Sequence, residues 1–86
     1  MKVAIWDTYA SKEDGSTMHF DIVVPESLKN EQTIHNFGRE YLGSKRLKVK
    51  EFCINKCEFC HIESATPEME LSIHKKGYYI IEMENC

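Results

Sequence analysis

Two stretches near the start of the chain have the residue pattern of β-strands. Residues 2–9 and 17–24 are rich in β-branched and aromatic side chains, and the segment between them contains Asp14-Gly15, a dipeptide typical of tight turns. We therefore expect a β-hairpin, which Pro25 ends because proline has no N–H to donate. In the second strand, apolar residues at alternate positions form one face: Met18, Phe20, Ile22 and Val24.

Two later segments have the spacing of helices. Asn30 is a suitable N-cap for a helix over about residues 31–42, whose apolar residues recur every three or four positions, and Gly43 is expected to stop it. Thr66-Pro67-Glu68 predicts the start of a second helix, since threonine caps, proline is tolerated at the first position and glutamate complements the helix dipole. We expect that helix to end at Gly77.

Two more strands complete the predicted fold. Lys45 to Phe52 alternates apolar and basic residues, and Tyr78 to Met83 is rich in strand-forming residues. The expected element order is ββαβαβ in a single domain over residues 1–86. This order predicts an α+β fold with a mainly antiparallel or mixed four-stranded sheet and two helices packed on one face.

Composition narrows the class of protein. The chain has 86 residues, of which 42% are hydrophobic and 29% charged, enough for one compact core. No run approaches the roughly 18 consecutive apolar residues of a membrane span, and the N-terminus lacks the pattern of a signal peptide. We therefore expect a cytoplasmic protein that contacts no membrane. A net charge of -3 argues against a nucleic-acid partner.

The cysteines are the first candidates for chemistry. In a reducing compartment, four cysteines indicate metal or thiol chemistry better than disulfides. Cys57 and Cys60 have the two-residue spacing that lets both thiolates reach one tetrahedral zinc ion, but they supply only half of a site. The remaining donors would come from Cys53, His61, Cys86, His19 or His74.

Other roles for this loop stay open. Cys57 to His61 also matches the pattern for covalent haem attachment, which ordinarily requires export. The pair Cys57 and Cys60 would suit a thiol-redox protein if a helix N-terminus or a cation lowered the pKa of the first thiol, but the next expected helix starts only at Pro67. Both cysteines can also be reduced, partly buried structural residues.

A second group of polar residues lies in the hairpin. His19 and Asp21 share one face of the second strand, and Asp7 in the first strand reaches them if the register permits. A histidine beside a carboxylate is the minimum for acid-base chemistry or for an oriented metal ligand. It is also an ordinary cross-strand polar pair, and we favour that interpretation from the sequence.

Several segments in the same order resemble a known family. They are Trp6-Asp7-Thr8-Tyr9, Asp14-Gly15, Met18-His19-Phe20-Asp21, Cys57 to Glu63, Gly77 to Ile81, and Cys86. Together they resemble the small bacterial domain-of-unknown-function family numbered twenty twenty-four, and the resemblance covers essentially the whole chain. It implies a single α+β domain and no established activity.

The resemblance also ranks the candidate ligands. Cys53 lies outside the family-like positions, which favours Cys57, Cys60 and Cys86 as thiolates, with His61 or alternatively His19 as the fourth donor. We therefore expect an uncharacterised, non-catalytic cytoplasmic protein whose cysteine loop binds structural zinc. The alternatives are a thiol-redox protein and an interaction module with purely structural cysteines. The expected partner is an unknown protein or small molecule, and the chain is expected to be a monomer or a weak homodimer.

Overall fold

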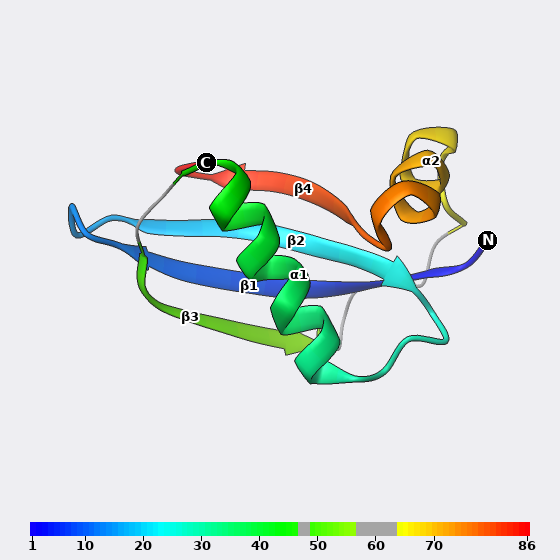
Figure 1. Cartoon of the computed structure of the whole chain (residues 1–86), viewed down its shortest axis with the longest axis horizontal. Coiled ribbons are helices and arrows are strands. Elements are labelled where there is room, and N and C mark those ends of the chain that lie inside the picture. The colour runs from blue at the N-terminus through cyan, green and yellow to red at the C-terminus, as the bar shows by residue number, and fades with distance from the viewer. Residues whose placement is uncertain (47–48, 57–63) are drawn as a thin grey trace.

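The structure of the protein, a computed structural model, describes residues 1–46 and 64–86 and the backbone of residues 49–56 (Figure 1). Within residues 49–56 it also describes the side chains of Val49 and Cys53. Among these residues the elements in chain order are β1 (Val3–Lys12), β2 (Thr17–Pro25), α1 (Glu31–Ser44), β3 (Val49–Lys56), α2 (Pro67–Lys76) and β4 (Tyr79–Glu84). The described strands form one sheet in the order β3-β1-β2-β4, and every pairing is antiparallel.

The predicted hairpin at the centre of the sheet is confirmed. Gly15 has a φ of 92°, a left-handed conformation that glycine adopts without a steric penalty. The Asp14 carboxylate accepts hydrogen bonds from the backbone N–H of Ser16 at 2.9 Å and from its hydroxyl at 2.6 Å. This turn fixes the register of β1 against β2, and with it the positions of Asp7 and Asp21, which lie directly opposite each other.

The larger core lies between the sheet and α1. The predicted apolar face of β2 is completely buried there, together with the even-numbered residues of β1 from Ala4 to Ala10. From α1, Ile34, Tyr41 and Leu42 pack against this face, and Figure 1 shows the helix crossing in front of the sheet. Because side chains alternate along a strand, the odd-numbered residues of both strands point to the other side.

The second helix packs on that other side, and the expectation of two helices on one face is wrong. Ile73 of α2 is buried against Val3 and Val23, which belong to the opposite parity from the α1 core. Ile5 and Met69 extend this smaller cluster. The structure therefore has three layers, helix, sheet and helix. The physical reason is that one end of the second sheet face is apolar and must be covered.

The helix caps agree with the sequence. Asn30 accepts a hydrogen bond from the N–H of Thr33 at 3.0 Å, and Thr66 accepts one from the N–H of Met69 at 3.2 Å. Gly77 ends α2 with a φ of 92° and donates its N–H to the carbonyl of Ile73 at 2.8 Å.

The end of α1 and the start of β3 differ from expectation. Gly43 lies inside α1, which continues to Ser44 and is followed by Lys45 as the C-cap. The Ser44 hydroxyl donates to the carbonyl of Tyr41 at 2.7 Å and so satisfies one terminal helix acceptor. Because the helix runs further than expected, the strand predicted from Lys45 begins only at Val49.

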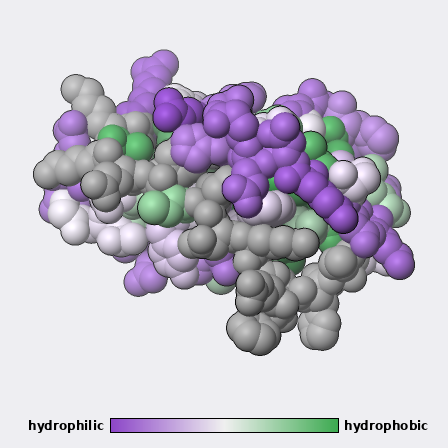
Figure 2. All heavy atoms as spheres, turned by 90° about the horizontal axis from the view of Figure 1, so that it is seen from below, coloured by the Kyte–Doolittle hydropathy of each residue, from purple (hydrophilic) through white to green (hydrophobic). Residues whose placement is uncertain are grey.

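The part of the described surface that Figure 2 shows is largely polar. In the view of Figure 2, its hydrophobic areas are small and are separated by hydrophilic side chains. No helix among the described residues has the length and apolar character needed to cross a membrane.

Candidate metal centre

Three side chains that can bind a metal converge on the face of the hairpin that points away from α1. The pairs Asp7 with Asp21 and Tyr9 with His19 lie directly opposite each other in neighbouring strands. Asp7, Asp21 and His19 therefore point to the same side, and the ligand atoms of these three residues all lie within 4.8 Å of one another. Among the described residues, these three side chains make up the one cluster of at least three that could hold a metal ion together.

The histidine stands between the two carboxylates, within ion-pair distance of both but hydrogen-bonded to neither. His19 Nε2 lies 3.6 Å from Asp7 Oδ1 and 3.7 Å from Asp21 Oδ1. These distances exceed those of a hydrogen bond, and both His19 Nε2 and Asp21 Oδ1 are buried without a hydrogen-bond partner. Two buried polar atoms that face each other without a hydrogen bond cost stability unless something binds between them.

The electrostatics of the cluster favour a bound cation or proton. Burial, followed by a hydrogen bond with Asp7 and the negative charge of Asp7, raises the pKa of Asp21 to about 6, although the charge of His19 acts to lower it. The Asp21 side chain is 13% exposed, and that of Asp7 is 32% exposed. Two carboxylates held together in a partly buried position repel each other, and a cation removes that repulsion.

The spacing suits a transition metal. Ligands bound to zinc at about 2.0–2.2 Å with tetrahedral angles lie roughly 3.4 Å apart, close to the separations of His19 Nε2 from the two carboxylates. Imidazole and carboxylate are ligands for zinc and similar first-row ions, whereas magnesium and calcium prefer oxygen alone. Three protein ligands leave at least one coordination position for water or another molecule.

Tyr9 forms the border of the cluster. Its ring stacks on the His19 imidazole with centroids 4.4 Å apart and planes inclined by 9°. Tyr9 is 43% exposed, while α2 covers the far end of the same sheet face around Val3 and Val23. The cluster therefore lies where this face changes from covered to exposed, so that an ion can reach it from solvent.

The predicted cysteine site is only partly within the described residues. Cys57, Cys60 and His61 lie outside them, so the zinc site and the thiol-redox alternative both stay predictions. Cys86 is described: its thiol is exposed and donates to the carbonyls of His19 at 3.3 Å and Glu84 at 3.4 Å.

The structure also shows where two of the other candidate residues lie. The thiol of Cys86 does not join the Asp7, His19 and Asp21 group, although its residue lies beside the backbone of His19. Cys53 is an exposed residue of β3 paired with Tyr9, so it sits inside a strand and not in the loop after it.

The hairpin register brings together Asp7, His19 and Asp21, for which the sequence favours an ordinary cross-strand polar pair. The signal was present, because an Asp-Gly turn centred near residue 14 places residues 7 and 21 opposite each other.

The fold and the cluster define a small antiparallel α+β domain with a helix on each face of its sheet and a candidate metal centre on its hairpin. The family model described as Domain of unknown function (DUF2024) matches residues 1–83, and the chain belongs to this family. The NMR structure of a protein from Nitrosomonas europaea, a structural genomics target, is similar, with a TM-score of 0.73 and 30% sequence identity. That match covers 100% of this chain and 99% of the other. A search of curated proteins gave no match.

Proposed function

We propose that the protein binds a divalent transition-metal ion, zinc or a similar first-row ion, through Asp7, His19 and Asp21. One observation carries this proposal: three ligand atoms from adjacent strands converge within 4.8 Å while two of them are buried without a hydrogen-bond partner. A cation at the centre would pair with all three at once. It would also offset the repulsion between the carboxylates.

The test is metal binding by protein that has been freed of metal with a chelator. Calorimetric titration with zinc is expected to show a site whose affinity His19→Gln or Asp21→Asn weakens by at least about tenfold, because each removes one of three ligands. The matched control is Glu13→Gln, which alters an exposed carboxylate elsewhere. If the ligand and control variants bind zinc equally well, the proposal is wrong.

Cobalt distinguishes this centre from a cysteine site. Thiolates are soft ligands and give bound Co²⁺ an intense charge-transfer absorption that imidazole and carboxylate do not give. We expect Co²⁺ bound at the Asp7, His19 and Asp21 group to lack that absorption and to be lost in Asp7→Asn. A site at Cys57 and Cys60 would show the absorption, lose it on mutation of either cysteine, and be insensitive to Asp7→Asn.

A further inference from the structure

The outer edge of β4 is open among the described residues. In the sheet order β3-β1-β2-β4, this strand pairs with β2 on one side only. An edge strand presents backbone N–H and C=O groups that can pair with another strand. β4 runs from Tyr79 to Glu84 and contains no proline that would remove one of these donors.

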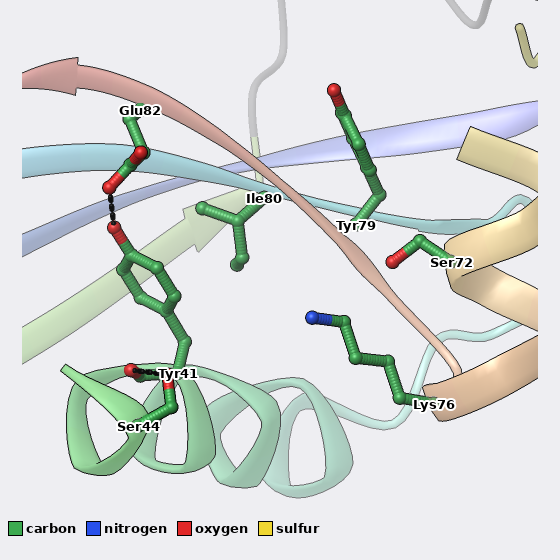
Figure 3. Close-up of a pocket in the computed structure, with 7 residues that line it drawn as sticks. All are labelled: Tyr41, Ser44, Ser72, Lys76, Tyr79, Ile80 and Glu82. Carbon is green, nitrogen blue, oxygen red and sulfur yellow. Dashed lines mark hydrogen bonds between the residues drawn. The ribbon is translucent and has the colours of Figure 1, made fainter. Parts of the chain in front are cut away.

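A groove follows this edge. It has a volume of about 280 Å³, and its walls come from both helices (Figure 3). Tyr79 and Ile80 are neighbours in the strand and point to opposite sheet faces, yet both line the groove, which therefore runs along the strand edge itself. The other side chains used below are Tyr41 and Ser44 of α1 and Ser72 and Lys76 of α2.

The polar atoms of the groove leave the strand edge uncovered. The Ser72 hydroxyl donates to the carbonyl of Tyr78 at 2.6 Å, and the Ser44 hydroxyl donates to its own helix. The end of the chain is held against β2, because the Asn85 amide donates to the carbonyl of Thr17 at 2.6 Å. Among the described residues, the strand edge is thus left without a cover.

The charges along β4 select the partner. Lys75 and Lys76 end α2 two residues before the strand begins, and Glu82 and Glu84 stand at the other end of the strand. Lys45 already forms an ion pair with Glu82, and the Tyr41 hydroxyl donates a hydrogen bond to the same carboxylate, whereas Glu84 is exposed. The start of β4 therefore follows the basic end of α2, while the end of the strand is acidic, and this arrangement is complementary to itself when two copies pair antiparallel.

We propose that two copies of this chain associate through their β4 strands, antiparallel and about a two-fold axis, so that the sheet continues from one copy into the other. Lys76 of each copy then lies beside the acidic end of the other strand, which carries Glu84. Because the axis relates the copies, each charge pair occurs twice. The interface is small and partly polar, so the dimer is weak, with a dissociation constant of about 10 μM or higher. This inference does not depend on the metal centre.

Sedimentation velocity from about 20 μM to about 1 mM protein tests the proposal. We expect reversible dimerisation that Glu84→Lys weakens by roughly tenfold, since the change acts at two symmetric contacts. Lys76→Glu is expected to weaken it similarly, and the double variant Lys76→Glu with Glu84→Lys to restore it. Glu13→Lys, with the same charge change in the exposed hairpin turn, is the matched control and is expected to leave dimerisation unchanged.

Several outcomes would overturn the proposal. A chain that stays monomeric at about 1 mM has no such interface. A dimer that tolerates Glu84→Lys uses another surface, and open-ended growth would indicate pairing of β4 with β3 of the next copy. If Lys76→Glu fails to fold, Glu84→Lys and amide hydrogen exchange decide alone: only residues of β4 should gain protection as concentration rises.

Discussion

Asp21 is the residue on which the chemistry of the hairpin depends most. It faces the negative charge of Asp7 and the imidazole of His19 from a position that is only 13% exposed, and its pKa of about 6 records the cost of keeping it charged there. Without a bound cation, that cost lowers the free energy of unfolding. A residue that destabilises the free fold while completing a ligand set is typical of a binding site.

Replacing Asp21 should therefore stabilise the metal-free protein. The folded pKa of about 6 is above the ordinary 3.8, so the contribution of this group is favourable at low pH and is lost as pH rises through about 6. We expect Asp21→Asn to raise the free energy of unfolding by on the order of 1 kcal/mol at pH 7.5 and to change it little at pH 3.5.

Urea denaturation at the two pH values measures this difference. Asp14→Asn is the matched control with the opposite expected sign, because hydrogen bonds from Ser16 lower the pKa of the Asp14 carboxyl. A loss of stability in Asp21→Asn at pH 7.5 would show that the carboxylate is paired in the free protein and would contradict the electrostatic account.

At the scale of elements, the sequence predicted what depends on local chemistry and was less successful where packing decides. The caps at Asn30, Thr66 and Gly77 each follow from one side chain or one backbone angle. Gly43 had the same appearance as Gly77, but burial of Tyr41 and Leu42 carries α1 past it. The position of α2 on the second face depends on contacts between Ile73 and strands far away in the chain, which no local pattern specifies.

The two glycines should respond to alanine in opposite ways. At Gly77 the φ of 92° is strained for alanine, and a Cβ would lie 3.0 Å from Cζ of Phe37, so Gly77→Ala should cost about 1–2 kcal/mol. Gly43 is helical with open space around its Cα, so Gly43→Ala should stabilise by about 0.5 kcal/mol. Thermal denaturation of both variants measures the contrast, and equal signs would contradict the assigned helix ends.

The second layer has an equally direct test. Ile73 is 8% exposed and packs on Val3 and Val23, so Ile73→Ala should destabilise the protein by about 2–3 kcal/mol. Leu71 on the same helix is 63% exposed, and Leu71→Ala should change the free energy of unfolding by less than about 0.5 kcal/mol. Chemical denaturation compares the two, and similar effects would place α2 elsewhere.

At the scale of the whole molecule, the sheet has one fully used face and one divided face. α1 covers the first face. On the second face, α2 covers one end, and Asp7, His19 and Asp21 lie at the other. The sequence predicted one domain and the parity of β2, and those features fixed which residues share the second face. The sequence did not predict how much of that face a helix would cover.

Because the cluster joins the two central strands, metal binding should stabilise the entire fold. At a free zinc concentration a hundredfold above the dissociation constant, we expect a gain of about 2.7 kcal/mol and a rise in Tm of several degrees. Calorimetric scans with zinc and with chelator measure it. Asp7→Asn should abolish the rise, whereas Glu13→Gln should retain it, and a rise of the same size in both variants would place the stabilising ion at another site.

The flat stacking of Tyr9 on His19 has a spectroscopic consequence. An aromatic ring 4.4 Å above an imidazole shields the protons beneath it through its ring current, which moves their NMR signals upfield. Of the four histidines in the chain, His19 is thereby given a recognisable resonance in its native environment. Metal binding to Asp7, His19 and Asp21 can therefore be followed through the NMR signal of His19 without any added label.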